Sequence, residues 1–257
     1  MLALVTHCLS DPFTHYAAGL YIQLGSLFSS CPACYTTAHV CYDEDDELTS
    51  NVVSYWSKRA WQEHCWFRVM GWVLSRNKLC RRSIGRNAVM QHIAGKAEMV
   101  WMCDADFVFG NGCLDTLVQL HRNNKLHHLA TPDSFYVHKT HELGDKLLAS
   151  VQFDYEPPSL DQNDFMLSRA EVPIGGLQIV SGELIAEGYL PDGNWQKPVD
   201  GSKGFASFID DRKFRQYHEK KGRRWDRIAL PNLYRIRHSK SSMNPTGDSK
   251  KFRTPNG

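Results

Sequence analysis

An apolar run that ends in two carboxylates is the strongest constraint on how this chain folds. Residues 99–103 read Met-Val-Trp-Met-Cys, and Asp104, Ala105 and Asp106 follow directly. Such a run predicts a buried strand of a parallel sheet. Because alternate residues of a strand point to the same side, Asp104 and Asp106 can face one ligand together. Two carboxylates at a buried strand end are costly without positive charge, so the motif predicts Mg²⁺ or Mn²⁺ carrying a diphosphate. Taken alone, the motif also fits a helix cap or a solvated acidic turn.

Strand-like and helix-like segments alternate through the first half of the chain, and Gly95 ends the helix before the acidic strand. This alternation predicts a mainly parallel sheet, with ligands bound beyond the carboxyl ends of its strands. The predicted strands are residues 2–6, 35–42, 66–73, 99–103 and 129–136, and the predicted helices are residues 12–29, 49–63, 82–94, 114–123 and 143–151.

The order of several short motifs resembles that of the GT-A glycosyltransferases, particularly the family 2-like group. Arg86-Asn87 opens a helix, a glycine follows, and an apolar strand closes on Asp-x-Asp. Later come a glycine pair, an acidic pair on a helix and a late histidine, so the resemblance extends over most of the chain. It implies an α/β fold of the GT-A type, a Rossmann-like and mainly parallel sheet flanked by helices, with a smaller acceptor-side subregion. It also implies metal-dependent transfer of a sugar from a UDP- or GDP-linked donor to an acceptor hydroxyl.

The length of 257 residues suits one domain with two functional halves. On this resemblance, residues 1–125 are the nucleotide-sugar-binding half. Residues 126–240 are the acceptor-side and catalytic half, and residues 241–257 form a basic flexible tail.

The donor side is expected to use residues that follow the first strands. The resemblance maps nucleotide contacts onto Thr6, with His7 beside it, and onto Asp43. The acidic run that begins at Asp43 fits a solvated turn equally well. Arg86 can approach the nucleotide, pair with Asp104, or serve only the start of its helix. Asp104 is expected to contact both the metal and the nucleotide.

The resemblance assigns the metal to Asp104, Asp106 and His238. His238 follows a strand-like alternation, so that Tyr234, Ile236 and His238 share one face. Imidazole is a suitable ligand for Mn²⁺. One histidine among twelve has an ordinary structural role as its alternative.

The acceptor side is expected around Gly175 and Gly176, which let the backbone approach a ligand closely. Their alternative is an ordinary turn that enters a strand. Trp195 can stack on a sugar or belong to the core. Asp210 and Asp211 are the candidates for the general base, where the family pattern has Glu-Asp, and which of the two acts is open. Their alternative is a helix cap or an ion pair.

Positive charge is concentrated at the end of the chain. From Arg212 to Gly257 there are fourteen Lys or Arg residues and three Asp or Glu residues. This charge fits a diphosphate or a polyanionic acceptor. The expected acceptor is a saccharide or small molecule. The positive charge at the end of the chain adds a modified DNA base as a further option.

Two other function classes remain open. A nucleotidyltransferase of similar fold would normally carry a glycine-rich loop after the first strand, and residues 6–12 contain no glycine. A carbohydrate or nucleic-acid binding module would use the basic end without catalysis. Cys31-Pro32-Ala33-Cys34 makes a zinc site conceivable, but no second pair of this spacing occurs. No signal peptide or membrane-spanning segment is recognised, so a cytoplasmic protein is expected.

Overall fold

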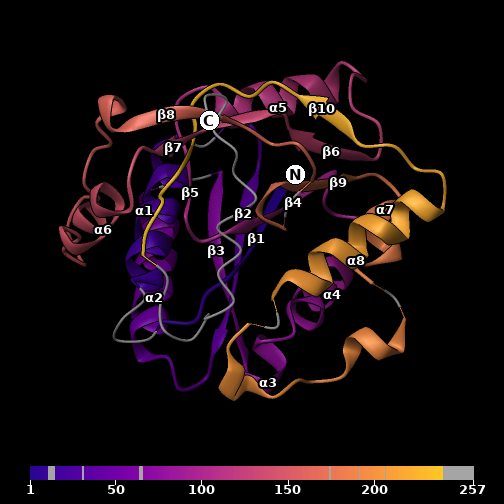
Figure 1. Ribbon diagram of the computed structural model, residues 1–257, viewed down its shortest axis with the longest axis horizontal. Helices are drawn as coiled ribbons and strands as arrows, with labels where there is room; N and C mark the ends of the chain where they lie inside the picture. The colour runs from indigo at the N-terminus through magenta and orange to yellow at the C-terminus, as the bar shows by residue number, and fades with distance from the viewer. Residues whose placement is uncertain are drawn as a thin grey trace.

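A seven-stranded sheet forms the centre of the protein (Figure 1). The structure is a computed structural model that describes residues 1–10, 15–30, 32–63, 66–173, 175–190, 192–205 and 207–239. The sheet consists of β1 (Leu2–His7), β2 (Thr36–Asp43), β3 (Phe67–Leu74), β4 (Met99–Asp104), β6 (Leu129–Pro132), β9 (Gln178–Ser181) and β10 (Asp226–Ile228). Their order is β10-β6-β9-β4-β1-β2-β3, in which β4, β1, β2 and β3 are parallel. β9 runs antiparallel to both β4 and β6.

Helices cover both faces of this sheet, α1 and α2 on one and α4 and α8 on the other (Figure 1). The alternation of β1 shows why. Leu2 and Leu4 pack into the core with α1 and α2, whereas Ala3 and Val5 pack with α4 and α8. Because both faces are covered, the central strands are apolar throughout. The longer helices are α1 (Tyr16–Ser29), α2 (Glu47–Glu63), α4 (Arg82–Ile93), α5 (Cys113–Arg122), α6 (His141–Ala149) and α8 (Ser207–Lys220).

A second, four-stranded sheet lies beside the first, in the order β5-β11-β7-β8. Its strands are β5 (Phe107–Phe109), β7 (Ser134–His138), β8 (Phe165–Arg169) and β11 (Leu233–Arg235). The remaining short helices are α3 (Arg76–Leu79), α7 (Leu184–Glu187), and the 3-10 turns η1 (Gln162–Asp164), η2 (Gly175–Leu177), η3 (Gly193–Gln196) and η4 (Gly201–Lys203). β11 brings the last described part of the chain back to the segment that follows β4.

The predicted α/β fold with a mainly parallel sheet is confirmed, and two segments differ from the prediction. Residues 129–136 form two strands rather than one, because the chain passes at Asp133 from the first sheet to the second. The acidic strand ends at Asp104, so Asp106 lies in the turn between β4 and β5. The two aspartates are therefore brought together by a turn and not by the alternation of one strand.

The zinc alternative stays a prediction, because Cys31 of the Cys-x-x-Cys pair is not among the described residues. Cys8 and Cys41 are buried, and burial raises the pKa of both thiols to about 12. Across the described ranges, no group of three or more His, Cys, Asp or Glu side chains can hold a metal ion. Cys31 lies outside the described residues, and so does the predicted tail of residues 241–257. No helix in the described part of the chain is long and apolar enough to cross a membrane.

Candidate functional site

Four segments that are far apart in the sequence meet at the carboxyl end of β4. They are the turn after β4, the first half of α4, the glycine pair before β9 and the start of α8. This is where a sheet of this type gathers its ligands. Three of the predicted motifs, Asp-x-Asp, Gly-Gly and Asp-Asp, therefore lie in one place. We call this place the carboxylate centre, and define it by Asp104, Asp106, Asp211, Arg82 and Arg86.

Asp104 faces the positive end of α4. Its carboxylate lies 3.3 Å from Nη1 of Arg82, and 27% of its side chain is exposed. Burial raises the pKa of Asp104 and Asp106 adds to the rise, while Arg82 opposes it. A carboxylate in these surroundings is stabilised by any additional cation.

Asp106 is fixed by the second sheet. Its Oδ2 accepts a hydrogen bond of 2.9 Å from Nε of Arg235, and its backbone oxygen accepts one of 2.8 Å from the amide of Ile236. The other carboxylate oxygen, Oδ1, is buried and has no hydrogen-bond partner. A buried carboxylate oxygen without a donor is costly, so this atom calls for a cation or a donor from a ligand.

Asp211 lies in a buried network with two arginines. Its carboxylate accepts hydrogen bonds from Arg86, from Arg82 at 3.2 Å and from the hydroxyl of Tyr189 at 2.8 Å. Burial alone would raise the pKa of Asp211, but Arg86 and Arg82 outweigh it and hold the pKa below its usual value. With its arginines in place, Asp211 is a weak proton acceptor.

Asp210 has a structural task at the start of α4. It is 1% exposed, it accepts a hydrogen bond of 3.1 Å from the backbone amide of Ser83, and it lies 3.5 Å from Nη1 of Arg81. A carboxylate that bonds the first-turn amides of a helix stabilises that helix. Of the two predicted base candidates, only Asp211 belongs to the carboxylate centre.

The glycine pair lets the backbone pass directly beside two carboxylates. A Cβ atom on Gly175 would overlap the carboxylate of Asp211. A Cβ atom on Gly176 would lie 2.9 Å from Oδ2 of Asp104 and 2.6 Å from the ring of Phe107. Glycine is thus required at both positions by close approach to side chains of the protein, and the predicted approach to a ligand stays a prediction.

Gly175→Ala is expected to lower the free energy of unfolding by about 1–3 kcal/mol, because the new methyl group must displace Asp211 from its arginines. Urea denaturation measures this loss. Gly193→Ala is the matched control, because no atom lies within 4 Å of the Cβ it would add. The control should change stability by less than about 0.5 kcal/mol. Equal stability of the two variants would contradict the close approach.

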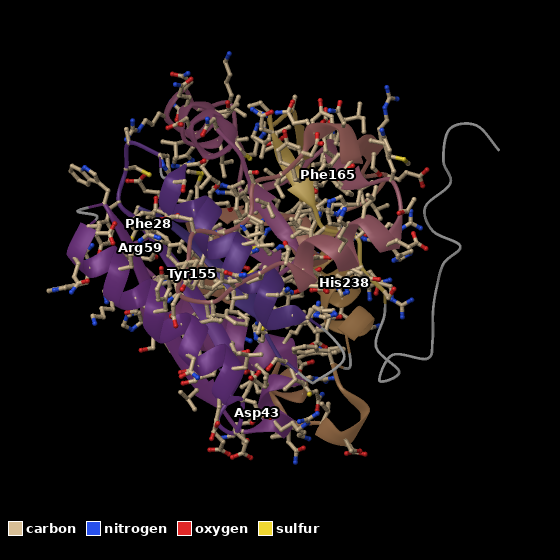
Figure 2. All side chains as sticks on the ribbon, turned by 90° about the vertical axis from the view of Figure 1, so that its left-hand side faces the viewer. Phe28, Asp43, Arg59, Tyr155, Phe165 and His238 are labelled. Atoms are coloured by element: carbon tan, nitrogen blue, oxygen red, sulfur yellow. The ribbon has the colours of Figure 1, made fainter. Side chains whose placement is uncertain are left out.

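Thr6, His7 and Asp43, which were predicted to contact the nucleotide, are all buried, and each has different neighbours. Thr6 is buried and donates to Oε1 of Gln23 at 2.9 Å. His7 is buried against Gly85 with neither ring nitrogen hydrogen-bonded, and burial, Arg86 and Arg82 together lower its pKa, which keeps the ring neutral. Asp43 is buried at the end of β2, with Arg76 3.8 Å away. Figure 2 shows Asp43 at the lower edge of the molecule, well apart from His238.

His238 contacts Tyr16, which lies near the aspartates of the carboxylate centre. Its ring packs edge-on against the ring of Tyr16, with 5.1 Å between the centroids. Burial raises the pKa of Tyr16 to about 12 and Asp106 contributes, so the hydroxyl stays protonated. The described residues hold no cluster of three or more His, Cys, Asp or Glu side chains close enough for a metal, so His238 is not gathered with the two aspartates. Its role as a metal ligand stays a prediction.

Trp195 lies outside the centre and is joined to it by α4. The guanidinium of Arg81 sits 4.5 Å above its ring, and its carbonyl accepts a hydrogen bond of 2.5 Å from the hydroxyl of Ser83. Since Ser83 and Arg81 also contact Asp210, Trp195 is linked to the start of α8.

Arg82 of the carboxylate centre, and two residues that contact its aspartates, were not predicted as site residues. Arg82 bridges Asp104 and Asp211, and its spacing of four from Arg86 on one helix was the available signal. Arg235 belongs to the basic end but was not assigned to Asp106. Gln23 donates hydrogen bonds to the backbone oxygens of Asp104 at 2.7 Å and Phe107 at 3.1 Å. The one sequence signal for this role was a polar residue within an otherwise apolar helix.

Comparison with solved structures identifies the architecture. The structure superimposes on a mannosyltransferase from Pyrobaculum calidifontis, solved with GDP-Man and Mn²⁺, with a TM-score of 0.51 and 16% sequence identity over 91% of this chain. The chain has a GT-A-like fold. It spans 56% of the length of that mannosyltransferase. Mouse xyloside xylosyltransferase 1 in its apo form gives a lower TM-score of 0.43 and 11% identity, with 88% of this chain and 84% of that chain covered. No protein-family model matches the sequence, and no curated protein sequence matches it.

Proposed function

We propose that this protein transfers a sugar from a nucleoside-diphosphate sugar, UDP- or GDP-linked, to an acceptor hydroxyl with the help of Mn²⁺ or Mg²⁺. The observation that carries the proposal is the pair Asp104 and Asp106 at the carboxyl end of β4, each in contact with an arginine, Arg82 or Arg235. Oδ1 of Asp106 is buried without a partner, which fits a cation. On a GT-A-like fold, this position is where a donor diphosphate would meet its metal.

The residues present fit such an ion without a complete shell of protein ligands. Asp104 and Asp106 would hold it, and diphosphate and water oxygens would complete the shell, as is usual for Mg²⁺. When bound, the ion neutralises the charge that develops on the departing nucleoside diphosphate. Arg82 and Arg235 now pair with these two carboxylates. Both guanidinium groups would supply positive charge to a diphosphate bound at this site.

On the acceptor side we assign the proton transfer to Asp211. In this step the acceptor hydroxyl gives its proton to the Asp211 carboxylate. The hydroxyl oxygen bonds to the anomeric carbon of the sugar, and the bond from that carbon to the diphosphate breaks. Arg82 lies 3.2 Å from Asp211 and 3.3 Å from Asp104. A move of Arg82 towards the diphosphate would let the pKa of Asp211 rise and make it a better base.

Calorimetry with UDP and GDP, with and without Mn²⁺, tests the proposed function, followed by a screen of nucleotide sugars for hydrolysis. We expect nucleotide binding only when the divalent ion is present, and slow hydrolysis of one class of donor. A protein that binds neither nucleotide in the presence of Mn²⁺ or Mg²⁺ would contradict the proposal.

His238→Ala is expected to weaken Mn²⁺-dependent nucleotide binding by about tenfold and to leave the melting temperature of the metal-free protein unchanged. We expect this effect because His238 packs against Tyr16, and Tyr16 lies close enough to Asp104 and Asp106 for both carboxylates to raise the pKa of its hydroxyl. The exposed His128 provides a control, since His128→Ala should leave both quantities unchanged. A lower melting temperature with unaltered nucleotide affinity would show that His238 only packs against Tyr16.

A further inference from the structure

A groove on the outer side of α8 has no role in the proposed chemistry. Helix α8 and the turn η3 border a surface depression of about 220 Å³. We call it the α8 groove, and the residues of its lining used below are Asp192, Trp195, Lys213, Gln216, Tyr217 and Lys220.

Helix α8 presents two different stripes. Asp211, Phe214 and His218 are buried, and the ring of Phe214 stacks on Tyr189 at 4.2 Å between centroids. The groove residues of α8 occupy positions i, i+3, i+4 and i+7 from Lys213, which is one face of a helix over two turns. One helix therefore carries Asp211 into the carboxylate centre and lines the groove with its other side.

The groove is electropositive. Lys213 and Lys220 are exposed and make no ion pair with any described residue. The carboxylate of Asp192 also lines the groove and accepts a hydrogen bond of 3.0 Å from the backbone of its own turn, so its one negative charge is set against the two lysines. Uncompensated cations around a hollow fit an anionic ligand.

Two aromatic rings, both partly buried against the core, also line the groove. Trp195 and Tyr217 line the groove from η3 and α8, and each has a cation against one side, Arg81 at 4.5 Å and Lys221 at 4.4 Å from the ring centroid. Lys213 and Lys220 are seven positions apart, which is about 10 Å along the helix axis. That length equals roughly three stacked nucleotides at about 3.4 Å each. Single-stranded nucleic acid offers both required partners in alternation, flat bases for the rings and phosphates for the lysines.

We infer that the α8 groove binds single-stranded nucleic acid. The Trp195 carbonyl accepts a hydrogen bond from the Ser83 hydroxyl and the Ser83 amide donates one to Asp210, so the η3 wall of the groove is fixed to the start of α8. The binding itself needs neither donor nor metal and is measured separately.

Fluorescence anisotropy of a labelled single-stranded DNA of about 12 nucleotides, with the full chain and no nucleotide or metal, tests the inference. The double variant Lys213→Gln/Lys220→Gln should bind about tenfold more weakly than the unaltered protein. The slope of log affinity against log salt should also become shallower by about 1.4, which corresponds to two phosphate contacts at about 0.7 each. Tyr217→Leu should cost about tenfold through lost stacking, with the slope unchanged.

Lys58→Gln/Lys146→Gln is the matched control. Both lysines are exposed, on α2 and α6, and their replacement removes the same amount of charge at a distance from the groove residues in the sequence. It should bind as the unaltered protein does. Equal weakening in both double variants, or no binding of the unaltered protein at about 0.02 M salt, would overturn the inference. Binding of heparin but not of DNA, lost only in Lys213→Gln/Lys220→Gln, would assign the groove to an acidic polysaccharide and overturn it as well. Failure of DNA binding while Mn²⁺-dependent UDP or GDP binding persists would leave the proposed sugar transfer standing.

Discussion

Replacing Asp106 with asparagine is expected to weaken Mn²⁺-dependent binding of UDP or GDP by at least about a hundredfold. Partners that merely orient a metal ligand change metal affinity by about 10- to 100-fold, so loss of a ligand should exceed that range. The amide keeps an oxygen for Arg235 but loses the charge that offsets the ion. Isothermal calorimetry with and without Mn²⁺ measures the effect.

Asp115→Asn is the matched control for this experiment. Asp115 is a half-exposed carboxylate of α5 and takes part in no ion pair within the described residues. It should bind nucleotide as the unaltered protein does. Thermal unfolding of both variants shows whether each is folded. A variant that keeps its melting temperature but binds nucleotide weakly has lost the ion and not the fold. Unchanged nucleotide affinity in Asp106→Asn would remove Asp106 from the metal site.

Replacing Arg86 with methionine is expected to lower the free energy of unfolding by about 3–5 kcal/mol, because it leaves a buried charge without its partner. Arg86 is 1% exposed, and its Nη1 contacts both Asp211 and the hydroxyl of Tyr189. The pH dependence should change too. Because Asp211 has a lowered pKa in the folded protein, its pairing stabilises the fold above the unfolded pKa of about 3.9 and is lost as pH falls below it. Arg86→Met should lack much of this contribution, so its loss of stability relative to the unaltered protein should be largest near pH 7 and become smaller in acid.

The double variant Arg86→Met/Asp211→Leu provides the control for the ion pair. Apolar side chains in place of both partners remove the unpaired charge, so part of the lost stability should return. Urea denaturation of the two single variants and the double variant gives the coupling free energy. Strictly additive effects would show that Arg86 stabilises the protein through packing alone.

The sequence was a good guide to the elements and a weaker one to their ends. Buried parallel strands are apolar on both faces, so residues 2–6 and 99–103 were recognisable, and the GT-A-like fold follows from their order. The division of residues 129–136 was not recognisable, because both halves have strand character and only tertiary contacts separate them at Asp133. The same limit applies to Asp106, which a turn places beside Asp104.

At the candidate site, motifs were predictable and their mutual contacts were not. The glycine pair and Asp211 were singled out separately, yet nothing in the sequence shows that Gly175 touches the Asp211 carboxylate. Arg82 illustrates the reason. A surface-like helix arginine becomes a bridge between Asp104 and Asp211 only through the folding of segments more than a hundred residues apart. The assignments of metal, nucleotide and base residues stay predictions for the experiments above.

Gln23 has a consequence for how much binding energy the donor can use. One side-chain amide of α1 holds the backbone oxygens of Asp104 and Phe107, on either side of the acidic turn. The main chain of that turn is therefore already ordered before any ligand arrives. An incoming ion and diphosphate would need to reorient only carboxylate and guanidinium groups, and would lose little affinity to the ordering of a loop. Preorganisation of this kind lets the free energy of donor binding go into stabilising the leaving group.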